Sequence, residues 1–368
     1  MSTTHDTPDR PATASGPRRA YSQDWRAYNA AQTREKEMVA VLLRDLCNAI
    51  DSPVQRRGRP RIPLSDAVFS AVMKVYGTTS GRRAMTDIRE FEERGFVSRA
   101  PSYNSIFDYL DNPILTPLLQ AMIEESAKPL RTVETEFAVD SSGFSTSVFR
   151  RWFDHKYGRM QSSAEYVKAH VMVGVKTNIV TSVEVTPFYT NDYPLLPRLL
   201  ETSLANFNVA KVSADKGYSG RSNVEAITTA GALPLVAFKS NAKPGAPGPW
   251  RESFEFFREH QEEFYAQYHK RSNVETTFSM IKAKFGGYVR SKTPTAQANE
   301  VLCKVLAHNL CCLVQSFFEL GVEPAFWQSG RPTLGCERRS SWQPSLPQRQ
   351  PWSGPRKRGV KPMTQRAS

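Results

Sequence analysis

The sequence predicts an α/β protein: a mixed five-stranded sheet with flanking helices, preceded by an all-helical N-terminal region. Two observations carry this prediction. Apolar residues recur at helical spacing across residues 23–127, between Gly and Pro residues that end each pattern. After Glu136 the pattern changes to short apolar runs, several with a period of two, which alternate with helical segments.

The N-terminal region contains five helical patterns. In the first, apolar residues from Met38 to Leu46 predict a short amphipathic helix. The other four lie at residues 65–76, 83–92, 102–110 and 114–127. The pattern at 102–110 is compatible with the recognition helix of a helix-turn-helix, and equally with helical packing that makes no contact to bases.

The first three predicted strands are close together in the sequence. An apolar run at residues 137–139 ends in Asp140, which we expect at the end of the first strand. Residues 167–175 carry Val or Ala at every odd position, so they predict a strand with one buried face. Residues 179–185 repeat this pattern, and the turn Thr177-Asn178 between the two strands predicts a hairpin.

The remaining elements alternate between strand and helix. We expect the fourth strand at residues 208–214, followed directly by Asp215, and the fifth at residues 233–238. A helix at residues 222–230 connects them, and one long helix is expected from Glu252 to about Lys284.

The formal net charge of +13 is concentrated at the two ends of the chain. Residues 1–61 contain 11 Lys and Arg against 7 Asp and Glu, residues 331–368 contain 9 against 1, and +1 remains for residues 62–330. Such a distribution favours a polyanionic partner, nucleic acid before a membrane surface. The domain organisation we expect is a disordered N-terminus, a helical DNA-binding domain, a catalytic domain and a disordered basic tail, at residues 1–22, 23–130, 131–330 and 331–368.

Arg57 and Arg59 are candidate DNA-binding residues in this basic chain. They lie in the sequence Arg-Gly-Arg-Pro, which resembles an AT-hook that inserts Arg side chains into the narrow minor groove of A·T-rich DNA. A flexible basic linker that contacts backbone phosphates without selectivity fits the same residues.

Several classes of protein are disfavoured. The five cysteines are odd in number and lack CxxC spacing, which indicates a reducing compartment rather than a disulfide framework or a zinc site. The N-terminus has no apolar segment of the kind found in signal peptides. Residues 301–320 are apolar but contain Lys304, His308 and Glu319, so we expect a buried helix rather than a membrane span. We therefore expect a soluble, cytoplasmic protein that does not bind membranes.

Three carboxylates occupy informative positions in the predicted sheet: Asp140, Asp215 and Glu275. Two follow strands and the third lies in the long helix, an arrangement that can bring them together at one edge of the sheet. Converging carboxylates repel one another, and hard divalent cations relieve that repulsion. A pair of such ions, about 3.5–4 Å apart, is the recurring device for displacement at phosphorus. We expect Mg²⁺, with Mn²⁺ able to substitute.

The surroundings of Glu275 strengthen this hypothesis. On a helix of about 100° per residue, Tyr268, Arg271, Glu275 and Lys282 fall within an arc of about 60°. One face would then present a metal-binding carboxylate beside two cations and a phenol. We expect Arg271 and Lys282 to clamp DNA phosphates, and Tyr268 to hydrogen-bond or stack beside them.

This pattern, Tyr-x2-Arg-x3-Glu-x6-Lys, resembles the signature of bacterial insertion-sequence transposases of the DDE class. Residues 138–142, Ala-Val-Asp-Ser-Ser, resemble the first-Asp strand of that family, and residues 212–218 resemble its second-Asp motif. The resemblance covers residues 55–325. It implies an RNase H-like catalytic domain, Mg²⁺ dependence, recognition of terminal inverted repeats and target DNA, and a homodimer in the synaptic complex. The basic tail after Gly330 departs from the family, and the short span from Asp215 to Glu275 leaves no room for the large β insertion that some members carry.

Three further residues have open roles. Lys168 and His170 share one face of a predicted strand, where they could contact DNA phosphates or simply form a solvated face. Asp192 follows the hairpin, where it could cap a helix or contribute an acidic group near the metals.

The function we predict is two-metal hydrolysis at transposon ends followed by strand transfer of the 3′-hydroxyl into target DNA. Two alternatives remain open from the sequence. One is a structure-selective nuclease of the same fold that lacks strand transfer. The other is a catalytically silent DNA-binding protein derived from a transposase.

Overall fold

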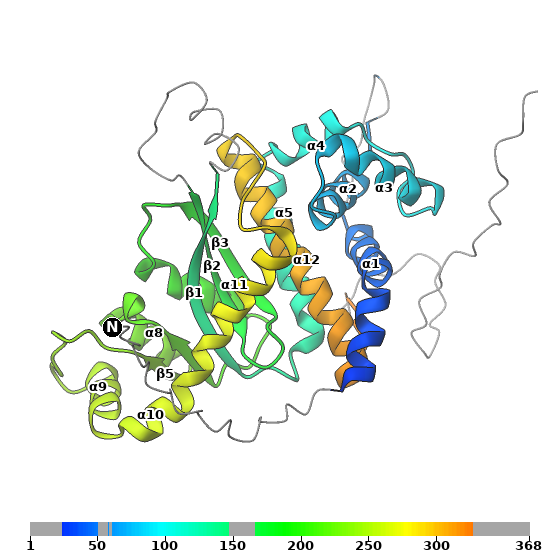
Figure 1. Ribbon diagram of the computed structural model, residues 1–368. Helices are drawn as coiled ribbons and strands as arrows, with labels where there is room; N and C mark the ends of the chain where they lie inside the picture. The colour runs from blue at the N-terminus through cyan, green and yellow to red at the C-terminus, as the bar shows by residue number, and fades with distance from the viewer. Residues whose placement is uncertain (1–23, 51–57, 59–60, 147–165, 327–368) are drawn as a thin grey trace, which may run out of the picture.

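A mixed five-stranded sheet with the strand order β3-β2-β1-β4-β5 forms the centre of the molecule (Figure 1). The computed structural model describes residues 24–50, 58, 61–146 and 166–326. The strands are β1 (Glu136–Ser145), β2 (Tyr166–Gly174), β3 (Val180–Pro187), β4 (Lys211–Ala214) and β5 (Leu233–Val236). The first three pair antiparallel, whereas β4 and β5 run parallel to β1. The sheet has the five strands that the sequence predicts, and it is consistent with the RNase H-like fold that the family resemblance implies.

The hairpin between β2 and β3 forms as expected. Asn178 adopts a positive φ of 61°, a conformation that Asn tolerates better than most side chains. The buried carboxylate of Glu134 accepts hydrogen bonds from the backbone N–H groups of Lys176 (3.1 Å) and Thr177 (2.5 Å). The turn is therefore fixed by its own backbone and by a carboxylate just before β1.

Strand β1 is longer than the sequence predicts. We expected it to end at Asp140, but it continues to Ser145, and Asp140 lies in its middle opposite Val171. The polar residues after Asp140 have weak strand propensity on their own. They are held by the ladder to β2, in which Ser142 pairs with Ala169 and Ser145 with Tyr166, so tertiary pairing overrides local preference.

Two helices connect the later strands. Helix α8 (Arg221–Thr229) joins β4 to β5 as predicted. Helix α7 (Leu196–Leu204), which packs against β3, was not predicted. It follows a short 3₁₀ turn, Tyr193–Leu195, and has Pro in its first turn, where the missing N–H does no harm.

The predicted long helix from Glu252 is broken into separate segments. They are α9 (Pro249–Glu259), α10 (Gln261–Tyr268), a 3₁₀ turn at His269–Arg271, and α11 (Ser272–Phe285). The break lies at His260, whose φ of −116° and ψ of 48° are not helical. Because the chain bends there, Phe257 of α9 packs edge-to-face on Phe264 of α10 with ring centroids 5.0 Å apart. The single-helix prediction was wrong for this reason.

Five helices precede the sheet: α1 (Trp25–Asn48), α2 (Leu64–Tyr76), α3 (Gly81–Glu93), α4 (Tyr103–Leu110) and α5 (Leu115–Ala127). Helix α1 starts well before the predicted pattern, because Asp24 caps it and accepts hydrogen bonds from the N–H groups of Arg26 and Ala27 at 3.0 Å. The connection from α3 to α4 spans residues 94–102, which is longer than the 3–4-residue turn of a helix-turn-helix. The packing role of α4 is therefore favoured.

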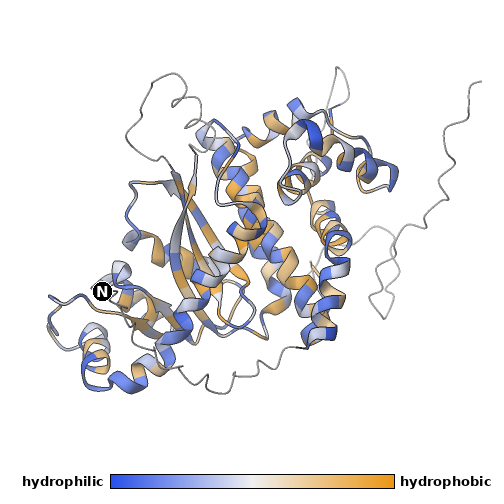
Figure 2. Cartoon of the chain, in the orientation of Figure 1, coloured by the Kyte–Doolittle hydropathy of each residue, from blue (hydrophilic) through white to orange (hydrophobic). Residues whose placement is uncertain are grey.

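Helix α12 (Pro294–Leu320) lies between the sheet and the N-terminal helices and packs against α1, α2, α5 and β3 (Figure 1). By length and composition it could cross a membrane, but 78% of its most apolar window is buried inside the molecule. Figure 2 shows apolar residues gathered where α12 meets its neighbours. The predicted burial of this segment is confirmed.

Asn309 fixes α12 to two other elements. Its side-chain carbonyl accepts a hydrogen bond from the N–H of Val180 (2.9 Å), and its amide donates to the carbonyl of the same residue (2.7 Å). The amide also contacts Ser126 Oγ (3.0 Å) at the end of α5. One buried side chain thus completes the backbone hydrogen bonds of an edge strand and joins it to two helices.

Candidate active site

Asp140 on β1 lies beside Asp215, which directly follows the parallel strand β4. Val139 of β1 is paired with Ala214 of β4, so the residue that follows each one occupies the same level of the sheet. Asp215 begins a 3₁₀ turn, Lys216–Tyr218, and its Oδ1 accepts a hydrogen bond from the N–H of Gly217 at 2.6 Å. A Cβ at Gly217 would approach Asp215 Oδ1 to 2.8 Å, so a larger residue there would displace the Asp215 carboxylate.

Arg271 connects the first Asp to Glu275 of α11. Its Nη1 lies 3.3 Å from Asp140 Oδ2, and its Nη2 forms an ion pair with the Glu275 carboxylate. The Arg271 and Asp140 side chains are 20% and 21% exposed, whereas Glu275 is 56% exposed. Arg271, in the 3₁₀ turn before α11, thereby joins β1 to α11 through its guanidinium.

The electrostatics of Asp140 show that the three carboxylates influence one another. The pKa of Asp140 is raised to about 6, mainly by burial and in addition by the negative charges of Asp215 and Glu275. The hydrogen bond from the N–H of Ser141 (2.7 Å) and the charge of Arg271 oppose this rise in pKa. A carboxylate with a pKa this far above 3.8 is one whose charge lacks sufficient compensation from the protein.

The donor set fits a hard divalent cation, although the carboxylates are not gathered around one point. Among the residues that the structure describes, no group of three or more His, Cys, Asp or Glu side chains is close enough to hold a metal ion. The guanidinium of Arg271 lies between two of the carboxylates, where it bridges Asp140 and Glu275. Carboxylate oxygens are the ligands that Mg²⁺ prefers, and a divalent cation would relieve the repulsion that contributes to the raised pKa of Asp140.

Tyr268 and Lys282 contact other residues of this group. The Arg271 guanidinium lies 5.8 Å from the centre of the Tyr268 ring, which is stacked on Phe264. Burial raises the pKa of Tyr268 to about 12, so the phenol stays neutral and able to donate. Lys282 donates a hydrogen bond of 2.6 Å to Ser142 Oγ, on the residue two positions beyond Asp140 on β1. Asp140 and Ser142 face the same side of the strand, so the contact places a cation beside the first Asp.

Lys168 and His170 gather around Asp192, and the predicted cap at Asp192 is wrong. The carboxylate of Asp192 makes no capping hydrogen bond. Instead it lies 2.5 Å from Lys168 Nζ and 3.2 Å from His170 Nδ1, and it accepts a hydrogen bond from Ser141 Oγ at 2.9 Å. Asp192 is thus joined through Ser141 to the residue directly after Asp140. Only its position after the hairpin pointed to it in the sequence.

His170 has no exposed surface, so a direct contact with DNA is not available to this side chain. Burial lowers its pKa to about 4, and Nε2 lies 2.8 Å from Thr186 Oγ1. The ring is therefore neutral at neutral pH, and Lys168 provides the charge that balances Asp192. Arg57 and Arg59 lie outside the described residues.

Two open grooves meet beside Asp215, and both include Gly217 and Lys239. One is lined by Asp215, Ser240 and Asn241, and the other by Lys168, Asp192 and the residues after β3. In the second groove Phe188 and Tyr189 are 46% and 74% exposed. Cations and exposed aromatic rings beside a carboxylate site suit the phosphates and bases of a nucleic acid. Lys239 and Tyr189 were missed in the sequence because nothing in their local pattern sets them apart.

Opposite charge changes around Asp140 are expected to move its pKa in opposite directions. Arg271→Gln removes a positive charge that stabilises the carboxylate, so the pKa of Asp140 should rise above 6. Glu275→Gln removes a negative charge, so it should fall. Carboxyl ¹³C NMR of the metal-free protein measures both shifts, with Glu225→Gln on the exposed side of α8 as the control. Shifts of the same sign in the two variants would contradict the arrangement.

Comparison with known proteins adds one match. Residues 131–310 match the family model described as the transposase DDE domain. This span includes the sheet, Asp140, Asp215 and the whole of α11. No curated protein matches the chain.

Proposed function

This chain carries the DDE domain of transposases across residues 131–310, and from this premise we propose that it cleaves transposon ends by two-metal hydrolysis and transfers the 3′-hydroxyl into target DNA. The observation that carries the proposal is that Asp140 on β1 lies beside Asp215, which directly follows the adjacent parallel strand β4, and that Arg271 joins Asp140 to Glu275. We assign the binding of Mg²⁺ or Mn²⁺ to these three carboxylates.

Each residue around the carboxylates has a role in this proposal. When bound, the two ions would activate the attacking hydroxyl and stabilise the leaving oxygen. Arg271, released from Asp140 and Glu275, would be free to pair with a DNA phosphate, for which its planar guanidinium is well suited. Lys282 and Tyr268 would contact neighbouring phosphates, and burial of Lys282 beside Ser142 lowers the pKa of its ammonium without removing its donors.

DNA would approach from the side of the sheet edge where these residues are exposed. Lys168 and Lys239 line a groove there, together with the exposed Tyr189. We propose that residues 23–130 form a DNA-binding unit for the terminal inverted repeats, that residues 131–330 catalyse the reaction, and that Arg57, Arg59 and the basic tail at 331–368 add non-selective contacts to phosphates. A cytoplasmic homodimer that holds two ends in synapsis completes the proposal.

Strand transfer separates this proposal from its closest alternative. Pre-cut DNA ends, taken from the inverted repeats that flank the gene, are incubated with a supercoiled plasmid and Mg²⁺, and joined products are measured on a gel. A transposase should join the ends to the plasmid, whereas a structure-selective nuclease should cut DNA and leave no joined product. Glu275→Gln serves as the matched inactive variant.

A catalytically silent DNA-binding protein is the second alternative. The raised pKa of Asp140 argues against this alternative. Burial and two neighbouring negative charges raise this pKa to about 6, which destabilises the ionised carboxylate, and DNA binding alone does not require such a carboxylate. Calorimetry with Mg²⁺ tests the point. A silent protein should release no heat when Mg²⁺ is added. A functional site should give a heat of Mg²⁺ binding that the substitution Asp140→Asn abolishes.

A further inference from the structure

Glu35 of α1 is a buried carboxylate that contacts two other helices. Its Oε1 accepts a hydrogen bond of 2.7 Å from Tyr76 Oη at the end of α2. Its Oε2 forms an ion pair with Lys284 Nζ in the last turn of α11. Glu35 is 8% exposed, and a carboxylate that has lost most of its hydration needs such partners to remain charged. Each oxygen of Glu35 therefore has a partner on a different helix.

The last residue of α11 makes a second contact with the N-terminal helices. Phe285 is 3% exposed, and the centroid of its ring lies 5.9 Å from that of the Tyr76 ring. Tyr76 thus packs against α11 with its ring and donates a hydrogen bond to α1 with its hydroxyl. The end of α11 is therefore in contact with both α1 and α2.

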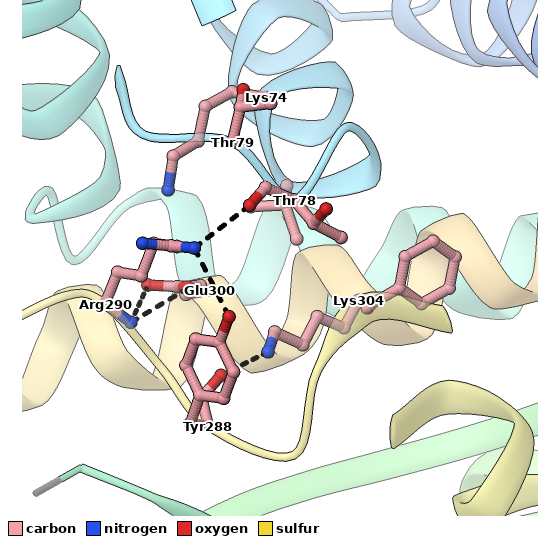
Figure 3. Close-up of a pocket in the computed structure, with 9 residues that line it drawn as sticks. Lys74, Thr78, Thr79, Tyr288, Arg290, Glu300 and Lys304 are labelled. Atoms are coloured by element: carbon pink, nitrogen blue, oxygen red, sulfur yellow. Dashed lines mark hydrogen bonds between the residues drawn. The ribbon is translucent and has the colours of Figure 1, made fainter. Parts of the chain in front are cut away.

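The connection between α11 and α12 is fixed in the same region (Figure 3). Arg290 Nη2 donates a hydrogen bond of 3.1 Å to the carbonyl of Thr78, in the turn after α2. The carboxylate of Glu300 on α12 accepts a hydrogen bond of 3.0 Å from the N–H of Arg290. Lys304, also on α12, donates to the carbonyl of Gly286 at 2.7 Å. The chain that follows α11 is therefore held by the turn after α2 and by α12.

The same connection pairs with the strand that carries the first Asp. Ser145, the last residue of β1, donates its N–H to the carbonyl of Gly287 (3.0 Å), and its own carbonyl accepts a hydrogen bond from the N–H of Val289 (2.9 Å). Asp140 lies earlier on this strand. The N-terminal helices are thus connected through one short segment to β1 as well as to α11.

Helix α11 runs from the carboxylates toward these contacts (Figure 1). Glu275 is in its first turn, and Lys284 lies about 14 Å further along the helix axis, at a rise of about 1.5 Å per residue. A helix is rigid over such a length, because its backbone hydrogen bonds are all formed. A shift of α11 at Lys284 is therefore expected to move Glu275 as well.

We propose that Glu35 is a positioning residue for the carboxylate site. With Tyr76 and Lys284 it fixes the end of α11 against α1 and α2, and thereby sets the position of Glu275 relative to Asp140. The inference rests on the proposed function, which gives Glu275 its role, and it assigns Glu35 no contact with substrate or metal. Displacement of a catalytic group by about 1 Å can reduce a rate by about 10²-fold, so a distant support of this kind matters.

The first test is a calorimetric titration of the full chain with Mg²⁺ in the absence of DNA. Glu35→Gln removes the charge that holds Lys284, so the affinity for Mg²⁺ should fall by about tenfold. Asp66→Asn is the matched control. Asp66 is 4% exposed, pairs with Arg44 of α1 at 2.8 Å and accepts hydrogen bonds from Ser98, so its loss weakens the same group of helices without removing a contact to α11. This control should keep the Mg²⁺ affinity of the wild type.

Lys284→Met separates positioning from a simple effect of charge. Glu35→Gln removes a negative charge and Lys284→Met removes a positive one, so electrostatics alone would change the Mg²⁺ affinity in opposite directions. Loss of one shared contact should instead weaken Mg²⁺ binding in both variants. The double variant should then bind Mg²⁺ no more weakly than either single variant, because both changes remove the same contact.

A second readout needs no metal. The backbone amide resonance of Glu275 in ¹⁵N NMR should shift in Glu35→Gln and stay unchanged in Asp66→Asn. If Glu35→Gln does not fold, Tyr76→Phe should give a smaller shift, because it keeps the ring on Phe285 and removes only the hydroxyl. The proposal is overturned if the Glu275 amide does not move, or if Glu35→Gln and Asp66→Asn weaken Mg²⁺ binding equally. If the wild type binds no Mg²⁺, the proposed function fails, and the Glu275 amide alone decides on the positioning.

Discussion

Asp140→Asn is expected to reduce Mg²⁺-dependent cleavage of transposon-end DNA by about 10³-fold or more. A bound metal ion contributes several kcal/mol of transition-state stabilisation, and each 1.4 kcal/mol corresponds to a factor of ten in rate. The amide keeps the shape of the carboxylate but supplies neither its charge nor its affinity for the metal. Cleavage of end-labelled DNA under single-turnover conditions measures the loss.

The same variant is expected to be more stable than the wild type. The folded pKa of Asp140, about 6, lies above its unfolded value near 3.8, so the ionised carboxylate destabilises the fold at pH values above 6. Replacing it with a neutral group should therefore raise the unfolding free energy at pH 7 by about 1–3 kcal/mol, and the gain should disappear as the pH falls below 4. Urea unfolding at several pH values checks this sign.

These two results together separate a catalytic residue from a structural one. A residue that only supported the fold would lose activity and stability together. Glu225→Gln, an exposed acid-to-amide change on α8, should alter neither. Full cleavage activity in Asp140→Asn, or a loss of stability at pH 7, would show that the carboxylate does not have the assigned role.

Asn309→Leu is expected to cause the largest loss of stability, about 2–6 kcal/mol. Leucine has a similar volume but cannot bond to the N–H and carbonyl of Val180, which would remain buried and unsatisfied. Each such group costs about 1–3 kcal/mol. Urea unfolding followed by circular dichroism measures the change.

Asn29→Leu, on an exposed position of α1, is the control for this change and should alter stability by less than about 0.5 kcal/mol. If Asn309→Leu were equally mild, water or a shifted β3 would have to satisfy the backbone of Val180. Hydrogen exchange at the Val180 amide distinguishes that outcome, because a freed N–H should exchange much faster.

Local patterns in the sequence predict the sheet well, because its strands are short apolar runs bounded by turns. The positions of Asp140 and Asp215 could be predicted for the same reason, since each follows directly on an apolar run. The extension of β1 beyond Asp140 could not, because its polar residues form a strand only when β2 lies alongside. The bend at His260 could not be predicted, because no Gly or Pro marks it in the sequence. It is accompanied instead by contacts between aromatic rings of α9 and α10.

The contacts around the site are harder to predict than its members. Helical spacing placed Tyr268, Arg271 and Glu275 near one another, and the structure does the same although a 3₁₀ turn interrupts the helix. That Arg271 bridges two of the carboxylates depends on the approach of α11 to β1, which no local pattern encodes. The network of Asp192 likewise joins residues that are distant in the chain.

The position of α12 limits how the gene for this protein can evolve by recombination with other genes. This helix comes from the C-terminal side of the chain, yet it supplies an inner wall for α1, α2 and α5. A recombination event that replaced residues 23–130 with the corresponding region of another protein would leave the apolar face of α12 without its complement. This region is therefore expected to change by substitution on the existing helices, and chimeras should fold only when α12 is exchanged together with them.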